Sequence, residues 1–478
     1  MSARRPCPAA PGPLEGYAAR FDDLFTRVAQ RRGFREYLAG LLAPRDRNKT
    51  LTALAGAEPV TGAQHPAVQR LQFFLSESRW DAERVNARRL ELLRADPATV
   101  PHGGGVLVID DSGDRKDGVK TAHVGHQWLG RYGKTDNGVV TVTTVWADER
   151  LYYPVDAVPY TPARHFAKGK SDPGFRTKLA IGADLAVRAR AAGFAFRAVA
   201  ADSAYGDQDG FRSELAEAGL PFVMALKPRR GTWAYGDDAH TPVDAARDLA
   251  WGGPDDPGDW RPVTRAFRDG HTETWWAADA TLGWWGPDGA RRLGVATADP
   301  GTLPGKATWS LGTNLPRPGG QVADSPHPAA DLAEIVRIYG IRHWIEQSYK
   351  QVKDELGWAD FQVRSDTAIR RHQVLVNCAF SFCWAAWFAD HPPQQDAAPP
   401  PGPGGGERGA RARRTAAGAV LAAGAARSAR LAFPLDRAAA LVVSMVQGTP
   451  APAAASPDQL GRGRPRPAPL HPDLTNYR

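Results

Sequence analysis

The sequence predicts an α/β protein in which one mixed β-sheet is covered by helices, preceded by a helical segment and interrupted by a β-rich insertion. Two observations predict this class. First, three strand-like segments, a helix, a fourth strand, a second helix and a fifth strand follow one another between residues 105 and 226. Second, acidic residues stand directly after the first and fourth of these strands.

Composition limits the classes of protein to which the chain can belong. Its 478 residues suffice for about three domains. The net charge of +8 suits a polyanionic partner such as nucleic acid. Three cysteines are too few for a disulfide framework, and Cys378 and Cys383 are predicted to be buried free thiols. Residues 1–16 lack a signal-peptide core, and the apolar run Val374–Phe388 is too short to span a membrane, which predicts a cytoplasmic protein without a membrane partner.

Residues 1–98 are predicted to form a helical N-terminal domain. Apolar residues recur at i, i+3, i+4 and i+7 in two runs: Phe21, Leu24, Phe25 and Val28, then Phe34, Tyr37, Leu38 and Leu41. A later helix, from Asp81 to Leu93, carries Arg84, Arg88 and Arg89. Such a basic face suits recognition of a DNA end, and the alternative is an arginine face that is only solvated.

Residues 99–227 are predicted to be the first part of a catalytic core. A buried strand from Gly105 to Ile109 ends in two acids, Asp110 and Asp111. The later elements are a hairpin of Val139–Trp146 and Leu151–Val155, a helix from Phe175 to Ala192, a strand from Phe194 that ends at Asp202, a helix from Gln208 to Ala218 and a strand from Phe222 to Leu226. This is the order of a ribonuclease-H-like fold, in which neighbouring strand ends bring two carboxylates together and a later helix supplies a third acid.

Residues 228–328 are predicted to be an inserted β-rich subdomain. They hold eight of the fifteen tryptophans and two strand-like pieces, Arg292–Thr297 and Thr308–Leu311. Those tryptophans form a small β core or stack on unpaired bases. The stretch Gly301–Ala307 superficially resembles a phosphate loop, but the glycine spacing is too short and Ala307 replaces the required Ser or Thr, so we expect no nucleotide cofactor.

Residues 329–390 are predicted to be the second, helical part of the core, and residues 391–478 a Pro-, Ala- and Arg-rich tail that is mostly disordered. The decisive stretch of the second part runs from Tyr339 to Lys353. Read as one helix at 3.6 residues per turn, it presents Glu346 on one stripe with a phenol and two cations, Tyr339, Arg342 and Lys353. Glu346 is therefore the candidate for the third acid.

Three carboxylates that converge at one end of a sheet repel one another unless a cation neutralises them. Oxygen ligands favour Mg²⁺ or Mn²⁺ over zinc. Two such ions can activate a water or sugar hydroxyl on one side of a phosphodiester and stabilise the leaving oxygen on the other. Asp110, Asp202 and Glu346 are thus predicted to be both catalytic residues and metal ligands, with Asp111 as the alternative to Asp110.

The spacing of Tyr339, Arg342, Glu346 and Lys353, with two, three and six residues between them, matches the signature of transposases of insertion-sequence family four and its relatives. Together with Ile-Asp-Asp-Ser-Gly-Asp, Ala-Asp-Ser-Ala-Tyr-Gly and the long β insertion, it makes the chain resemble transposases of the insertion-sequence 701 family.

The resemblance implies a DDE transposase that binds terminal inverted repeats, cleaves DNA with two Mg²⁺ ions and transfers the cut strand. Its partners would be double-stranded DNA, at the nucleoid of a bacterium, and a second copy of the chain. Tyr339, Arg342, Lys350 and Lys353 would contact DNA. Asp110 is preferred to Asp111 because the resemblance favours an acid followed two residues later by Ser or Thr.

Three other functions fit parts of the sequence. A transposase-derived DNA-binding protein without activity would not need its three acids intact, and a ribonuclease-H-like nuclease that only hydrolyses would cut without joining. A glycosidase with two carboxylates gives no reason for the cationic stripe beside Glu346.

Overall fold

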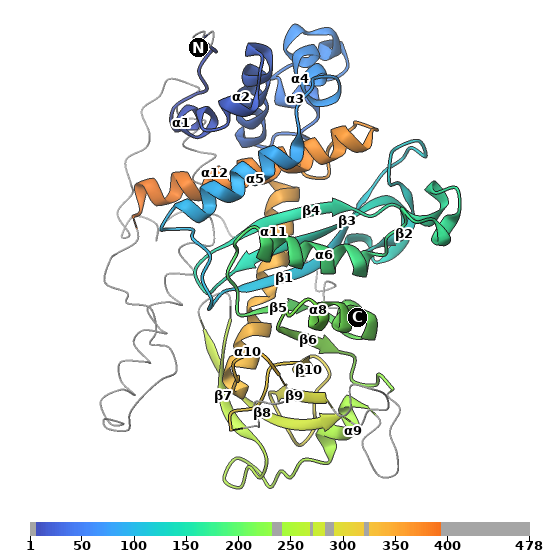
Figure 1. Cartoon of the computed structure of the whole chain (residues 1–478), viewed down its shortest axis with the longest axis vertical. Coiled ribbons are helices and arrows are strands. Elements are labelled where there is room, and N and C mark those ends of the chain that lie inside the picture. The colour runs from blue at the N-terminus through green and yellow to red at the C-terminus, as the bar shows by residue number, and fades with distance from the viewer. Residues whose placement is uncertain (1–5, 232–240, 268–270, 283–290, 320–324, 393–478) are drawn as a thin grey trace, which may run out of the picture.

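A computed structural model describes residues 6–231, 241–267, 271–282, 291–319 and 325–392. This part of the chain has the predicted α/β class, with a mixed sheet of ten strands across the middle and lower part of the molecule (Figure 1). The strands are β1 (Val106–Arg115), β2 (Gly125–Leu129), β3 (Lys134–Ala147), β4 (Tyr152–Pro159), β5 (Ala198–Ala201), β6 (Phe222–Leu226), β7 (Arg261–Ala266), β8 (Thr272–Leu282), β9 (Arg291–Thr297) and β10 (Thr308–Thr313).

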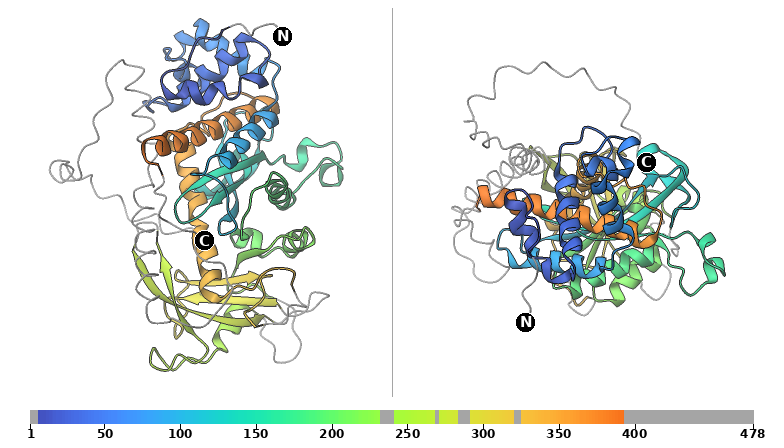
Figure 2. Two further views of the ribbon diagram at one scale, coloured as in Figure 1. Left: turned by 60° about the vertical axis from the view of Figure 1, so that its left-hand side comes forward. Right: turned by 90° about the horizontal axis from the view of Figure 1, so that it is seen from above.

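Helices cover the sheet on both faces. The α-helices of the described residues are α1 (Pro13–Ala19), α2 (Val28–Leu42), α3 (Leu51–Leu54), α4 (Pro66–Ser76), α5 (Ala82–Ala95), α6 (Lys178–Ala191), α7 (Ser203–Gly206), α8 (Asp209–Glu217), α9 (Pro242–Arg247), α10 (Leu332–Ile341), α11 (His343–Asp354) and α12 (Asp366–Asp390). Helix α10 contacts β5 to β9, and α11 contacts β1, β3 and β4. Helix α6 contacts β1, β3 and β4 and packs on α8. Figure 2 shows how α10 and α11 follow the sheet down the molecule.

The central strands lie in the order β4, β3, β1, β5, β6. Strand β1 is antiparallel to β3 and parallel to β5, and β5 is parallel to β6. The predicted end of β1 is wrong: the strand does not stop before the two acids but continues through them to Arg115. It does so because β3 pairs with it residue by residue from Val106 to Arg115.

Strands β7 to β10 of the insertion belong to the same sheet as the core. Strand β10 pairs antiparallel with β6, and β9, β8 and β7 follow in order. The insertion also has small cores of its own, in which Trp260 and Trp275 are buried and Trp251, Trp276 and Trp309 are packed. These five tryptophans therefore serve packing, and Trp233, Trp284 and Trp285 lie outside the described residues.

The N-terminal helices α1 to α5 pack around α12 above the sheet (Figure 1). The hydroxyl of Tyr37 on α2 lies 2.8 Å from Nδ1 of the fully buried His372 on α12. Cys378 and Cys383 on α12 are buried free thiols, as predicted. No helix of the described residues is long and apolar enough to cross a membrane. The predicted disordered tail lies almost wholly outside the described residues, from residue 393 onward.

Of the three arginines that the sequence places on α5, Arg84 is exposed and the other two are engaged within the chain. Arg89 is fully buried and donates to the backbone oxygens of Pro154 and Val155. Arg88 donates to both carboxylate oxygens of Asp23. Helix α5 thus uses these two arginines to attach the N-terminal helices to the core and to each other.

Candidate functional site

Three acids from distant parts of the sequence approach one another beside the sheet. Asp110 stands in the middle of β1. Asp202 follows β5 directly and caps α7, accepting a hydrogen bond of 2.9 Å from the backbone nitrogen of Ala204. Glu346 lies in the first turn of α11. The parallel pairing of β1 with β5 and the packing of α11 on β1 bring these positions together.

The guanidinium of Arg342 joins the three carboxylates. Its Nη2 atom lies 3.1 Å from Oδ2 of Asp110 and 3.8 Å from Oδ2 of Asp202, and its Nη1 atom lies 3.1 Å from Oε1 of Glu346. The Glu346 side chain is 64% exposed, whereas those of Asp110 and Arg342 are 18% and 15% exposed. The site is therefore closed at Asp110 and open at Glu346.

Electrostatics reflect this arrangement. Burial raises the pKa of Asp110 to about 7; Arg342 opposes this rise, while Asp202 and Asp111 add to it. Burial lowers the pKa of Arg342, but Asp110, Asp202 and Glu346 outweigh burial and leave its pKa raised. The negative charge of the acids thus needs a cation beside it, and in this conformation that cation is the Arg342 guanidinium.

Asp110 and Asp111 point to opposite faces of β1, as alternation along a strand requires. Asp110 faces α11, whereas Asp111 faces α6, where Nζ of Lys178 lies 3.2 Å from its Oδ1 atom. The hydroxyl of Tyr205 also donates to Asp111, at 3.4 Å. The structure therefore brings Asp110, and not Asp111, together with Asp202 and Glu346 around Arg342.

The helix predicted from Tyr339 to Lys353 is divided into α10 and α11 at Arg342. Nδ1 of His343 lies 2.6 Å from the carbonyl oxygen of Gly340. The backbone nitrogens of Arg342 and Ile345 donate hydrogen bonds to the carbonyl oxygens three residues earlier, instead of four as in a regular α-helix. The division leaves Arg342 and Glu346 one turn apart. It places Tyr339 on α10, where its ring packs edge-on against Trp309 of the insertion with centroids 4.9 Å apart.

Lys353 and Lys350 occupy different environments. Lys353 is buried, with Nζ 2.6 Å from Oδ1 of the buried Asp114 and 3.1 Å from the carbonyl oxygen of Gly113. Its ammonium is therefore not presented to DNA in this conformation, while Lys350 is exposed. Asp114 was missed by sequence reasoning, although a period of two from Asp110 would have placed it on the same face of β1.

The donor chemistry of the site suits a hard divalent cation, since all three acids offer carboxylate oxygens. Within the described residues, however, no group of three His, Cys, Asp or Glu side chains is arranged to hold a metal ion. In this conformation the guanidinium of Arg342 contacts all three carboxylates. A divalent cation held by the same oxygens would replace the contacts that Arg342 makes here.

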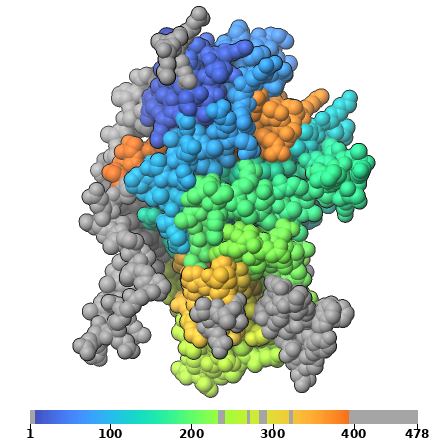
Figure 3. All heavy atoms as spheres, viewed as in Figure 1, coloured from blue at the N-terminus to red at the C-terminus, as the bar shows by residue number. Residues whose placement is uncertain are grey.

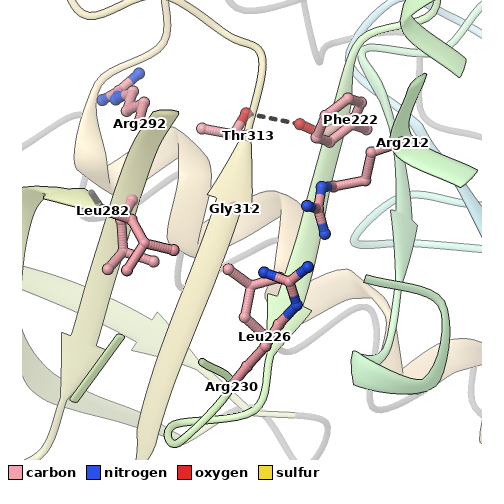
Figure 4. A pocket seen from close by; sticks show the side chains of 9 residues that line it. Arg212, Phe222, Leu226, Arg230, Leu282, Arg292, Gly312 and Thr313 are labelled. Atoms are coloured by element: carbon pink, nitrogen blue, oxygen red, sulfur yellow. Dashed lines mark hydrogen bonds between the residues drawn. The ribbon is translucent and has the colours of Figure 1, made fainter. Parts of the chain in front are cut away.

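A second candidate site is a small cavity between the core and the insertion (Figure 4). It is lined by Leu226, Leu282, Leu293 and three arginines: Arg212, Arg230 and Arg292. All three are engaged: Arg212 and Arg230 with Asp209, and Arg292 with Asp279 and backbone carbonyls. Because these guanidinium groups already have acidic or carbonyl partners, the cavity does not offer an anion-binding site.

Comparison with known proteins gives two matches. The model of a family described as "DDE superfamily endonuclease" matches residues 20–280, a range that includes Asp110 and Asp202 and ends before Glu346. A probable transposase for insertion sequence element IS701 from Microchaete diplosiphon is 30% identical over 362 residues, which is 75% of this chain and 84% of that protein.

Proposed function

The chain belongs to the IS701 family of DDE transposases, and we propose that it binds the terminal inverted repeats of its insertion sequence, cleaves DNA there with the help of divalent metal ions and transfers the cut strand. The observation that carries this proposal is the convergence of Asp110, Asp202 and Glu346 on one guanidinium. The strand order β4, β3, β1, β5, β6 supports a ribonuclease-H-like core.

Asp110, Asp202 and Glu346 would hold the metal, and their oxygen donors favour two Mg²⁺ ions, with Mn²⁺ as a substitute. When bound, such ions supply an activated water or hydroxyl and neutralise charge on the leaving oxygen. The chain's own residues fix where the phosphodiester lies. Asp110, on a strand in the middle of the sheet, provides a rigid ligand, and Glu346, on an exposed helix start, provides an accessible one.

Arg342 has two possible partners in this proposal. In the conformation described it neutralises the three acids. With divalent ions held by the acids, the guanidinium would be free to hold a DNA phosphate, for which its planar fork is well suited. Lys350 on α11 and Tyr339 on α10 complete the proposed contacts with DNA. Lys353 instead stabilises the position of α11 through its pair with Asp114.

The test is a supercoiled plasmid that carries the DNA flanking this reading frame, incubated with the purified chain and Mg²⁺. Nicked, linear and end-joined products are expected. Cutting without joined products would favour a nuclease that only hydrolyses, and binding without cutting would favour an inactive DNA-binding relative. The second copy of the chain, needed to pair two ends, would appear as a dimer in the DNA complex.

A further inference from the structure

The sheet extends beyond its central strands on one side. Strand β1 ends where Arg115 pairs with Gly138, and the first residues of β3 continue past that point with β2 alone. The segment after β4, with the short helices η4 (Ala163–His165) and η5 (Gly169–Ser171), packs against the base of this hairpin. Arg164 and His165 both contact the carbonyl oxygen of Val124, at 2.8 and 2.7 Å.

We define residues 115–138 and 160–178 as the basic arm. It projects at the right of Figure 1, and its atoms protrude from the same edge in Figure 3. The first segment contains five Lys or Arg and two Asp, and the second contains five Lys or Arg and one Asp. The two segments of the arm therefore carry net charges of +3 and +4, in a chain whose total net charge is +8.

Several cations of the arm are used internally. Arg131 pairs with Asp354 at the end of α11 at 3.4 Å, Arg176 pairs with Asp184 at 3.2 Å, and Lys178 pairs with Asp111. Lys120, Lys168 and Lys170 are different. All three are exposed, and none makes an ion pair with another described residue. Their charge is available to a partner.

The hairpin also exposes aromatic side chains. Along β2, Gln127 and Leu129 are buried, whereas His126 and Trp128 alternate with them on the outer face. Trp128 is 56% exposed and Tyr132, at the tip of the hairpin, is 46% exposed. A two-stranded ribbon with exposed cations and polar aromatic tips has the dimensions and charge that fit a groove of double-stranded DNA.

We propose that the basic arm is a second contact with DNA, an inference that rests on the proposed function. The arm would hold the phosphate backbone of the duplex beside the carboxylate site, on the side opposite the insertion. The arm is connected to that site by short links. Asp110 and Arg115 belong to one strand, and Arg131 pairs with the helix that begins beside Glu346. Two arginines of α5, Arg88 and Arg89, are engaged within the chain, whereas Lys120, Lys168 and Lys170 of the arm are exposed without an ion pair among the described residues.

The experiment compares two triple variants of the full chain. The first reverses the arm cations: Lys120→Glu, Lys168→Glu and Lys170→Glu. The matched control reverses three exposed cations elsewhere: Arg229→Glu, Arg261→Glu and Lys306→Glu. Affinity for a fluorescent duplex of the flanking terminal sequence, and for a shuffled duplex, is measured by anisotropy without metal over a series of salt concentrations.

We expect the arm variant to lose affinity for both duplexes by about tenfold or more, and to reduce the slope of log K against log salt by about 0.9 for each lost phosphate contact. The control variant should keep the wild-type slope. The preference for the terminal sequence should not change, because phosphate contacts carry no sequence information. A neutral triple variant, with Gln at the three arm positions, gives the same test if the reversal impairs folding.

An unchanged slope in both folded arm variants would overturn the arm proposal, and so would an equal loss in the control. Neither result depends on catalysis, because binding is measured without metal. Failure of the proposed function would appear separately, as wild-type protein that binds the duplex but produces no cleavage when Mg²⁺ is added.

Discussion

Nη2 of Arg342 lies 3.1 Å from Oδ2 of Asp110, at the closed end of a group of three carboxylates. This single contact links the arginine of the DNA-contact signature to an acid from the middle of the sheet. In the proposed mechanism, the guanidinium balances the charge of the acids in this state, and bound metal would balance it in another.

Arg342→Gln should have opposite effects on metal binding and on DNA cleavage. Without the guanidinium the acids repel one another, so we expect Mn²⁺ to bind about tenfold more tightly or better, an increase of about 1.4 kcal/mol in binding free energy. DNA cleavage should nevertheless fall, because the phosphate contact is lost. Metal-dependent shifts in Tm measure the first effect, with Arg337→Gln on α10 as the control. Equal Mn²⁺ affinity in both variants would contradict the proposed replacement of the guanidinium by metal.

Glu346→Gln should abolish cleavage while DNA binding survives, since only a proposed metal ligand is removed. We expect the cleavage rate to fall by more than about a hundredfold, because even outer partners of metal ligands are worth about 10–100-fold. The control is Glu355→Gln, an exposed glutamate at the end of the same helix. A normal rate in Glu346→Gln would remove this residue from the site.

The two adjacent aspartates should differ in their effects. Asp110→Asn is expected to eliminate cleavage. Asp111→Asn breaks only the partly exposed pair with Lys178, which contributes about 0–1 kcal/mol, and should leave most of the activity. Parallel plasmid-nicking assays and melting curves distinguish the two variants. The opposite ranking of activities would transfer the role of metal ligand to Asp111.

Lys353→Met should chiefly destabilise the fold. It leaves the carboxylate of Asp114, which is 2% exposed, without its ammonium partner, and breaking a buried pair costs about 3–5 kcal/mol. The double variant Lys353→Met/Asp114→Leu should recover most of that loss, because no buried charge then remains unpaired. Urea unfolding gives the free energies of unfolding. A Lys353→Met protein with wild-type stability and a reduced salt slope for DNA binding would instead support the contact predicted from the sequence.

Stability should fall as the solution is acidified from pH 6.5 to pH 4. Burial lowers the pKa of His372 to about 4 from an ordinary value of 6.5. The unfolded chain therefore binds a proton in this interval that the folded chain does not, so the stability present above pH 6.5 is lost progressively, by up to about 3 kcal/mol. His372→Asn should flatten this part of the curve of unfolding free energy against pH. The exposed His126→Asn should retain its slope, and an equal flattening in both would exclude His372 as the cause.

Local patterns were sufficient to predict the order of the central elements. The structure has a strand at Phe222–Leu226 and an acid directly after β5, as hydrophobic runs and turn residues predict. The extent of β1 was not predictable in this way, because aspartates and glycine disfavour strands and only pairing with β3 keeps the chain extended through them.

Contacts between distant segments account for the other differences. Nothing near Lys353 in the sequence identifies Asp114 as its partner. The spacing that matches a DNA-contact signature therefore could not show that the Lys353 side chain is buried. The division between α10 and α11 has a similar origin, since no proline marks it and packing against separate groups of strands sets each helix. The site could be proposed from the sequence as a set of residues, whereas the position of Arg342 among them required the fold.

Because β10 pairs with β6, a single ladder of backbone hydrogen bonds runs without interruption from β2 to β7. At about 4.8 Å between neighbouring strands, this path measures roughly 40 Å, comparable to one turn of a DNA duplex. Among the described residues, each strand along that distance is paired with the next. The spacing between the insertion and the opposite edge of the sheet is therefore set by the hydrogen-bonded strands themselves.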